Sequence, residues 1–365
     1  MSSVWLDIMT TKQVWFLGTL AEYLNDKGIE TWVTIRHYQE NTEVLDRAIE
    51  SGRFSFSYDK SGVHGGQSLK GKWESYIKRC DYLAKGLKER DIGCAFSLTS
   101  PEMARVAYGF QVPHVTTSDT PFADAVNRLT LPMCQKLVLS WLFKPEEFTK
   151  YAIAEEDLVY FKGIDEIAWT KDYEPDPKVL DEIGLNPDKP IVVVRALSPH
   201  FAVFAHLFDE FETGIEGIIK ELLEKTSADT QIVAIPRYGE QGPILRKEFG
   251  DKIKVVDHTE GPSLTSQADV LIAAGGTMNR EAALLGTFAI TMDPMAYDLV
   301  GEKWLAKKGL LMPTHDPTEA AAKAIELIEN EDLRKQVKKK AAKVRKQLED
   351  PTPVFYKEIK KFLEQ

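Results

Sequence analysis

The sequence predicts an α/β protein built from two doubly wound, Rossmann-like domains with parallel sheets. Short apolar runs alternate with segments whose apolar residues recur at helical spacing, as in parallel sheets covered by helices on both faces. The length of 365 residues is long for one such domain and comfortable for two. Proline-rich polar sequence over residues 165–190 interrupts the alternation, which then restarts.

The composition excludes several classes of function. Apolar residues make up 43% and charged residues 28% of the chain, enough for two cores. The formal net charge of -10 argues against general nucleic-acid binding. Cys80, Cys94 and Cys134 show no paired spacing, so we expect neither disulfides nor a metal site. Because no signal-peptide pattern and no run near ~18 apolar residues occurs, we expect a cytoplasmic protein without a transmembrane segment.

The first domain opens with a βαβ unit. Apolar residues at helical spacing follow a strand and a short turn, and Gly28 ends the helix in the position where glycine is usual. A β-branched strand, a second helix ending near Gly52 and a third strand come next. The expected elements are a strand at 4–9, a turn at 10–13, a strand at 30–35, a helix at 39–50 and a strand at 54–56.

Residues 60–72 contain four glycines and interrupt the alternation of strands and helices. Gly66 to Lys72 fits the G-x-x-x-x-G-K part of a P-loop, but the next residue is Trp73 instead of the Ser or Thr that holds Mg²⁺. We therefore reject a P-loop NTPase. The segment is expected to be a mobile loop in which His64 titrates near neutral pH, and it serves either as a lid or as a flexible connector.

Polar residues follow two later strands of this domain. Ser100 and Pro101 suit the start of a helix, and Glu102 is either a carboxylate that favours the helix dipole or a catalytic base. Asp119, in a segment 118–121 expected to begin a helix, is either a helix-start residue or a group at the ligand-binding edge of the sheet. The other expected elements are a helix at 73–90 and strands at 94–98, 112–117, 137–139 and 158–161.

The second domain carries the most informative stretch, residues 273–286. An apolar strand precedes Gly275 and Gly276, and good helix formers follow from Glu281 onward. Such a turn lets a ligand approach the backbone, and the helix start favours an anion. Arg195 and Arg237 each follow a strand of the same sheet and suit phosphate. The alternative is an ordinary packing turn. Strands are expected at 191–194, 231–235, 253–256, 270–272 and 288–292.

The C-terminal region is expected to be helical. A segment beginning at residue 331 is rich in lysine, and we interpret it as a solvated helix face in preference to a membrane or nucleic-acid surface. Residues 355–363 have amphipathic spacing. The expected domains are therefore 1–170 on the acceptor side and 171–350 for the donor. Residues 351–365 are expected to form a closing helix that could pack back on the first domain.

Nearly the whole chain resembles a mainly archaeal family known only as a domain of unknown function and regarded as GT-B-like. Five motifs carry the resemblance: H-G-G-x-S-L-x-G-K (64–72), S-P-E-x-A-R-V-A (100–107), A-V-N-R-L-T-L-P (125–132), P-R-Y-x-E-Q (236–241) and G-G-T-M-x-R-E (275–281). The two-domain pattern is also similar to UDP-N-acetylglucosamine 2-epimerases. The spacing Gly275-x5-Glu281-x4-Gly286 resembles the donor motif of MurG-type glycosyltransferases, in which the glycines face the diphosphate and the glutamate holds the ribose.

The resemblance implies two Rossmann-like domains facing across a cleft, with a nucleotide-diphosphate sugar, UDP-linked, as substrate and no tightly bound cofactor or metal. Gly275, Gly276, Thr277, Met278, Glu281, Arg195 and Arg237 would bind this donor, and Asp119, Glu102 or His64 would activate a hydroxyl of an unknown acceptor in the interdomain cleft. Thr11-Lys12-Gln13 stands where family members tend to have a proline and a histidine, so an expected base is missing. An enzyme is expected, with glycosyl transfer as the leading hypothesis. A UDP-N-acetylglucosamine 2-epimerase-like enzyme and an inactive nucleotide-sugar-binding protein are the alternatives, and a homo-oligomer is compatible with each.

Overall fold

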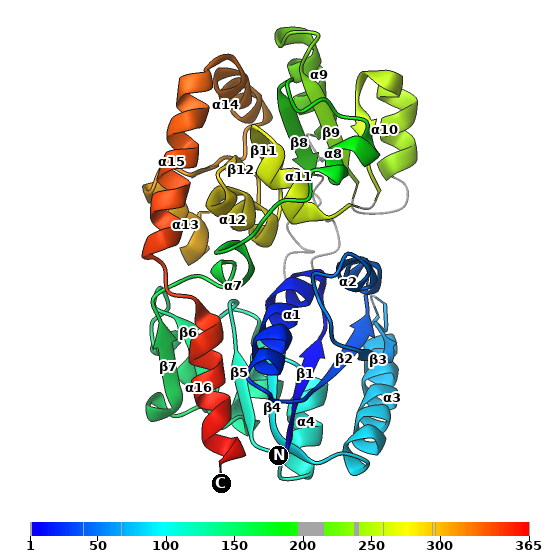
Figure 1. The fold of residues 1–365 in the computed structure, drawn as a ribbon, viewed down its shortest axis with the longest axis vertical. Helices are drawn as coiled ribbons and strands as arrows, with labels where there is room; N and C mark the ends of the chain where they lie inside the picture. The colour runs from blue at the N-terminus through cyan, green and yellow to red at the C-terminus, as the bar shows by residue number, and fades with distance from the viewer. Residues whose placement is uncertain are drawn as a thin grey trace. The chain divides into compact units, whose positions relative to one another are not determined.

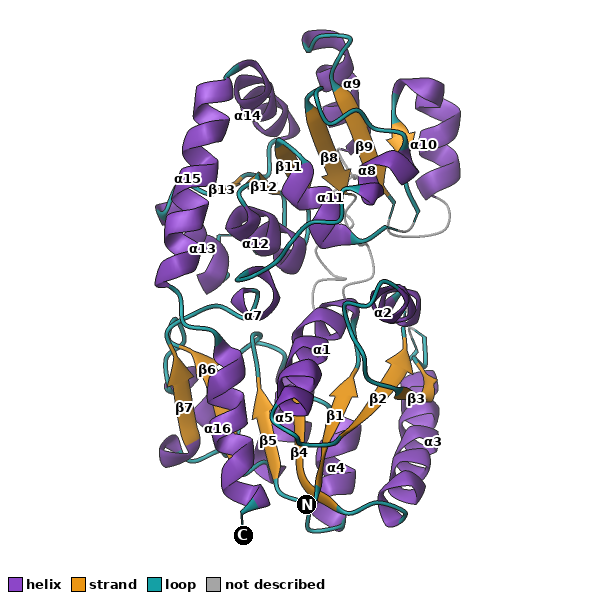
Figure 2. Ribbon diagram, viewed as in Figure 1, coloured by secondary structure: helices purple, strands orange, loops and turns teal. Residues whose placement is uncertain are grey.

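The computed structural model describes residues 2–38, 40–66, 68–195, 215–236, 241–257, 259–293, 295 and 297–364. The chain divides into two compact units (Figure 1). Unit 1 comprises residues 1–169 together with 349–365, and unit 2 comprises residues 170–348. Each unit is a parallel sheet combined with helices, as Figure 2 shows, so the predicted α/β class and the two Rossmann-like halves are confirmed.

Unit 1 has a seven-stranded parallel sheet in the order β3-β2-β1-β4-β5-β6-β7. Strands β1 to β3 are added towards one edge of the sheet and β4 to β7 towards the other, so the strand order reverses between β1 and β4. This is the doubly wound arrangement. Its strands are β1 (Ser3–Ile8), β2 (Thr31–His37), β3 (Tyr58–Val63), β4 (Ile92–Leu98), β5 (His114–Thr117), β6 (Lys136–Ser140) and β7 (Leu158–Phe161). Its helices are α1 (Thr11–Asp26), α2 (Asn41–Glu50), α3 (Leu69–Lys88), α4 (Pro101–Gly109), α5 (Asp124–Thr130), α6 (Glu146–Thr149) and α16 (Pro351–Leu363), and α7 (Ile167–Thr170) crosses the unit boundary.

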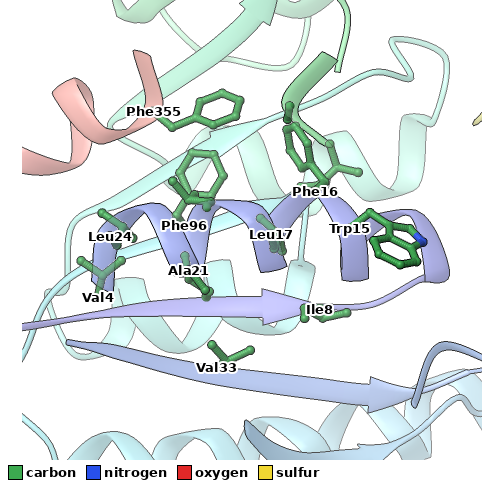
Figure 3. Packing of buried hydrophobic residues seen from close by; sticks show 14 of the residues in the cluster. Val4, Ile8, Trp15, Phe16, Leu17, Ala21, Leu24, Val33, Phe96 and Phe355 are labelled. Atoms are coloured by element: carbon green, nitrogen blue, oxygen red, sulfur yellow. The ribbon is translucent and has the colours of Figure 1, made fainter. Parts of the chain in front are cut away.

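Alternate residues of β1 supply two separate cores, because successive side chains of a strand point to opposite faces. Leu6 belongs to the larger core, which also contains residues of α1 and α16. Figure 3 shows Phe355 of α16 close to Phe16 and Phe96, at ring-centroid distances of 5.4 and 4.8 Å. Trp5 faces the other way and packs with residues of α3 and α4. Helices therefore cover both faces of the sheet of unit 1.

Unit 2 repeats the same winding in a six-stranded parallel sheet of order β10-β9-β8-β11-β12-β13. Its strands are β8 (Ile191–Arg195), β9 (Gln231–Ile235), β10 (Lys254–Val255), β11 (Val270–Ala273), β12 (Phe288–Thr291) and β13 (Leu311–Pro313). Its helices are α8 (Lys178–Ile183), α9 (Ile215–Lys225), α10 (Gln241–Phe249), α11 (Gly261–Gln267), α12 (Gly276–Leu285), α13 (Val300–Lys307), α14 (Pro317–Glu329) and α15 (Glu331–Gln347). The core of this unit includes Val193, Leu271 and Ala282.

Three local predictions for unit 1 were wrong. The third strand is β3, and Phe54 and Phe56 are buried loop residues instead, because the Phe54 ring fills the space that a Cβ at Gly18 would need, 2.6 Å away. The glycine-rich segment is shorter than expected, since the side chain of Ser68 accepts from the backbone of Gly71 and starts α3 four residues earlier. Residues 118–121 form a turn, and α5 begins only at Asp124.

Among the helices within the described residues, we find none that combines the length and apolar character required to span a bilayer.

Candidate functional site

The glycine turn of unit 2 lies at the switch point of its sheet, where β8 and β11 are neighbours. β11 ends at Ala273, whose register partner is Arg195 at the end of β8. Gly275 then takes a φ of 131°, which glycine adopts without steric cost, and α12 begins at Gly276. The predicted order of strand, glycine turn and helix is confirmed. It lies at the edge where doubly wound sheets bind ligands.

Two side chains fix the shape of this turn. The side-chain amide of Asn279 donates to the carbonyl oxygens of Ala273 and Gly275, at 3.0 and 2.9 Å. The Nη1 atom of Arg195 lies 3.4 Å from the Sδ atom of Met278, so this predicted phosphate-binding arginine does reach the turn. Sequence reasoning missed Asn279, whose only signal is an amide side chain four residues after the glycine that it stabilises.

The other predicted donor residues differ in accessibility. Thr277 is half-buried in the first turn of α12, and Met278 is buried. The side chain of Glu281 is also buried, with 4% of the residue exposed, which leaves little of its carboxylate for a ribose to contact. Arg237 lies outside the described residues.

Gly276 has a packing role that the sequence did not reveal. A Cβ at this position would lie 2.5 Å from Nη1 of Arg280 and 2.7 Å from Oε1 of Glu302. These two side chains form an ion pair of 2.7 Å, and Glu302 on α13 is fully buried. Gly301 likewise leaves room for Arg280, whose Cδ would be 2.8 Å from an added Cβ. The absence of a side chain at Gly276 therefore leaves room for the ion pair between Arg280 and Glu302, whether or not a ligand approaches the backbone.

The switch point of unit 1, between β1 and β4, contains a buried ionic network. Asp7 of β1 bonds to Nη2 of Arg79 from α3 and accepts a hydrogen bond of 2.5 Å from Ser100. Ser100 also caps α4 by accepting from the backbone of Met103 at 3.2 Å, as its sequence position predicted. Glu102, in the first turn of α4, lies 3.5 Å from Nη1 of Arg79. Because 4% of Glu102 is exposed, the candidate base is largely a buried counter-ion.

Gln13 cross-links the same switch point. Its side-chain oxygen accepts from the backbone N–H of Met9 at 2.7 Å, and its nitrogen donates to the carbonyl oxygen of Leu98 at 3.1 Å. These are backbone groups just after β1 and at the end of β4. The residue that stands where the resemblance implied a base is therefore a structural connector of the two central strands.

Lys12, which precedes Gln13 in the chain, is close to three carboxylates from distant parts of the chain. Its Nζ atom lies 2.6 Å from Asp119, 2.7 Å from Asp165 and 3.7 Å from Glu166. Asp119 retains 26% exposure of its side chain, whereas those of Asp165 and Glu166 expose 6% and 1%. Burial raises the pKa of Asp165, and the nearby Lys12 ammonium opposes that shift. Sequence reasoning missed Lys12, although its place in the first βα turn put it at the ligand-binding edge.

His64 lies beside the C-terminal end of β2. Its ring centroid is 4.4 Å from that of Tyr38, and the backbone N–H of Gly66 donates to its Nδ1 atom at 3.2 Å. Burial, with contributions from the charges of Arg36 and Lys72, lowers the pKa of His64 to about 4. The expectation that it titrates near neutral pH is therefore wrong, and the ring is neutral at pH 7.

The three candidate bases do not form one cluster. Glu102 and His64 are both close to Arg36, whose Nη1 atom lies 3.7 Å from Oε1 of Glu102. Asp119 belongs to the separate cluster around Lys12. In the described part of the chain, no group of three or more His, Cys, Asp or Glu side chains has the arrangement of a metal site.

Solved structures of proteins that bind UDP or UDP-sugars are similar to this chain over nearly its whole length. The UDP-GlcNAc 2-epimerase from Neisseria meningitidis, bound to UDP-GlcNAc, is 14% identical with a TM-score of 0.71, over 98% of this chain and 100% of that one. The Methanocaldococcus jannaschii UDP-GlcNAc 2-epimerase, in complex with UDP-GlcNAc and UDP, is 14% identical with a TM-score of 0.66, over 94% and 98%. Anabaena HepE, in complex with UDP-glucose, is 14% identical with a TM-score of 0.64, over both entire chains. The fold is therefore GT-B-like.

Sequence comparison reaches a more specific group. An uncharacterized protein of Methanocaldococcus jannaschii is 28% identical over 371 residues, which cover 99% of this chain and 98% of that protein. A family model described as "Protein of unknown function (DUF354)" matches residues 2–364. The predicted resemblance is thus confirmed, and the chain belongs to the DUF354 family.

Proposed function

We propose that unit 2 binds a UDP-linked sugar at the Gly275 turn and that the protein transfers the sugar to an acceptor. The observation that carries this proposal is the arrangement of Gly275, α12 and Arg195 at the switch point of the sheet. The first N–H groups of a helix and its dipole favour a diphosphate. Arg195 adds a cation beside the same turn, suited to a phosphate oxygen. The similar solved structures with UDP or UDP-sugars support the choice of nucleotide.

The leaving group of sugar transfer would be the nucleoside diphosphate, which gains negative charge as the glycosidic bond breaks. Backbone donors and an arginine that are already in place stabilise that charge without reorganisation. Thr277, in the first turn, would add a hydroxyl donor, and Arg237 a second cation. We assign Glu281 to the ribose hydroxyls, for which only the small exposed part of its carboxylate is available.

Unit 1 would supply the base. Of the three candidates, Asp119 suits this role best, because its carboxylate is partly exposed and is held by Lys12. A carboxylate in hydrogen-bond reach of an acceptor hydroxyl removes its proton as the hydroxyl attacks the sugar. Glu102 is buried between Arg36 and Arg79, so we assign it a positioning role. The neutral ring of His64 remains a third candidate.

A second candidate function is epimerisation at C2 of a UDP-sugar. It is favoured by the pairing of Asp119 and Asp165 on one lysine, in which burial raises the pKa of Asp165. Two neighbouring carboxyl groups whose environments differ in this way would supply an acid and a base.

Calorimetric titration with UDP, UDP-glucose and UDP-GlcNAc tests the proposal. Arg195→Gln is expected to weaken UDP binding about tenfold or more, the cost of a charge-assisted hydrogen bond. The matched control is Lys189→Gln, which removes one positive charge from an exposed ion pair just before β8, at the opposite edge of the same sheet. The affinity of this control variant for UDP should equal that of the wild type. Failure of the folded wild type to bind any of these ligands would refute a nucleotide-sugar site.

Turnover then separates the functions. Hydrolysis of the donor in the absence of an acceptor supports transfer, and exchange of the C2 hydrogen with solvent deuterium supports epimerisation. Binding without either reaction supports an inactive nucleotide-sugar-binding protein. In the transfer case, Asp119→Asn should lower kcat while leaving the dissociation constant for UDP unchanged, because the two groups lie in different units.

A further inference from the structure

Arg36, the penultimate residue of β2, has few partners for a guanidinium that is mostly buried. Its side chain is 17% exposed, and its Nη1 atom lies 3.7 Å from Oε1 of Glu102. Within the described residues its side chain donates no hydrogen bond, and its Nε atom is buried without a partner. The guanidinium carbon also lies 6.0 Å from the centre of the Tyr38 ring. A planar cation of this kind is suited to an oxyanion that accepts two parallel hydrogen bonds.

The loop after β3 brings a hydrogen-bond donor to the same place. The backbone N–H of His64 donates to the carbonyl oxygen of His37, at 2.9 Å, which ties the loop to the end of β2. Because Gly66 donates to Nδ1, that nitrogen is unprotonated, and in the neutral ring Nε2 carries the hydrogen. Nε2–H is therefore a donor, with no hydrogen-bond acceptor for it among the described residues.

The first turn of α3 adds Lys72. The loop backbone lies so close to this turn that a Cβ at Gly65 would be 2.2 Å from the carbonyl oxygen of Gly71, and a Cβ at Gly71 would be 2.3 Å from that of Gly65. Gly65 and Gly71, two of the three glycines of the motif at residues 64–72, are therefore needed for this close approach. Its effect is to hold His64 near Lys72, whose positive charge contributes to the lowered pKa of His64.

The local charge balance is positive. Arg79 pairs with Asp7 and also lies 3.5 Å from Glu102, so Glu102 is shared between two arginines. The charges of Arg36 and Lys72 both act on His64. Together with Arg79 they make three cations for the two carboxylates of this cluster, Asp7 and Glu102, so one positive charge is unmatched within it. An added anion would complete the balance.

We propose that Arg36, His64 and Lys72 form a binding site for an oxyanion, a phosphate or carboxylate group. Only its assignment to the acceptor rests on the proposed function: the second substrate would be an anionic molecule whose charged group is held here, in unit 1. Arg36 supplies two parallel N–H donors, His64 supplies Nε2–H and Lys72 supplies a mobile ammonium.

NMR of the histidine rings in the full-length protein tests this site directly. The signals of His64 are followed during titration with inorganic phosphate and, in a second arm, with acetate, both at constant ionic strength set with chloride. Saturable shifts with either anion are expected, together with a rise in the pKa of His64. A response to phosphate alone identifies a phosphate group as the ligand, and a response to acetate alone identifies a carboxylate.

Variants separate the site from general surface charge. Arg36→Gln should weaken anion binding about tenfold or more, and Lys72→Ala severalfold. Lys70→Ala is the matched control, since Lys70 lies on the same helical turn with its side chain 86% exposed, and it should bind as the wild type does. If Arg36→Gln does not fold, Lys72→Ala against Lys70→Ala decides. Equal weakening by these two variants, or no saturable shift with either anion, overturns the proposal.

Repeating the titration with saturating UDP distinguishes the two units. An oxyanion site in unit 1 should persist when the proposed donor site is filled, and should also persist in Arg195→Gln. A His64 response that UDP abolishes would overturn the separate site. A protein that shows the His64 response but binds no nucleotide would leave the oxyanion site intact and refute only the donor site.

Discussion

Replacing Gly276 by alanine is expected to destabilise unit 2, even though alanine is the better helix former. Gly276 does not have a positive φ, so its backbone conformation accepts alanine. The added methyl group would nevertheless lie 2.5 Å from Nη1 of Arg280 and 2.7 Å from Oε1 of Glu302, closer than real contacts allow. The two side chains must separate, which breaks a charge-assisted hydrogen bond of 2.7 Å to a fully buried carboxylate.

The magnitude follows from two opposing effects. A hydrogen bond to a charged group contributes about 1.5–3 kcal/mol. Alanine in place of glycine stabilises by roughly 0.4–1 kcal/mol, because the unfolded chain has less freedom to lose. The net loss in the free energy of unfolding is therefore about 1–2 kcal/mol. Gly217→Ala is the control, since Gly217 lies in the first turn of α9 with nothing within 4 Å of an added Cβ. It should be neutral or stabilising.

Trp304 provides the assay. It is the one tryptophan in residues 170–348, and it lies on α13 two residues after Glu302. Incorporated fluorotryptophan therefore gives a fluorine NMR signal that reports urea unfolding of unit 2 alone, which avoids treating a two-unit protein as a single transition. Adding Glu302→Ala should remove most of the cost of Gly276→Ala, because Arg280 is then free to move aside. Equal stability of Gly276→Ala and Gly217→Ala would show that the ion pair does not depend on this glycine.

Two further predictions concern unit 1. Gln13→Ala should lower the free energy of unfolding by about 2 kcal/mol or more, measured by urea titration, because the buried N–H of Met9 loses its hydrogen bond; an unchanged midpoint would show that the cross-link is dispensable. Burial lowers the pKa of His114 to about 4 in the folded state. As the pH falls below 6.5, His114 is therefore protonated in the unfolded state before it is protonated in the folded state. The stability of the folded state is then lost progressively between pH 6.5 and pH 4. Each pH unit in this window costs up to about 1.4 kcal/mol of stability. The variant His114→Gln should therefore lose less stability than the wild type over the same pH range, and an equally steep loss would show that His114 is not its cause.

The fold was predictable because its strands are short apolar runs between helical segments. Strands such as β8 and β11 are buried on both faces and therefore read as unbroken apolar sequence. The strand prediction failed where buried residues lie outside the sheet and where a strand of the sheet is polar. Phe54 and Phe56 look like strand residues, yet they pack over α1 from a loop, while the real third strand, Tyr58–Val63, is polar because it is an edge strand. Local sequence does not show whether an aromatic residue is buried in a strand or in a loop.

The site was predictable only in part, for a related reason. The position of Gly275 and the proximity of Arg195 follow from strand order, which the pattern of elements gives. Partners that come from distant segments do not follow from it. The contact between Lys12 and Asp165 joins residues 153 positions apart, and the dependence of Gly276 on Glu302 becomes visible only once α13 is packed beside α12.

The placement of α16 has a consequence for synthesis in the cell. Unit 1 is completed by residues that follow unit 2 in the chain, since Phe355 and Ile359 belong to its main core. Residues 170–348, the whole of unit 2, are translated in between. At about 5–20 residues per second, the nascent N-terminal sheet waits roughly 10–35 s with the apolar surface of α1 and β4 uncovered at that position. This interval exposes the growing chain to chaperones and to aggregation, and deletion of codons 351–365 should trap unit 1 in that unfinished state.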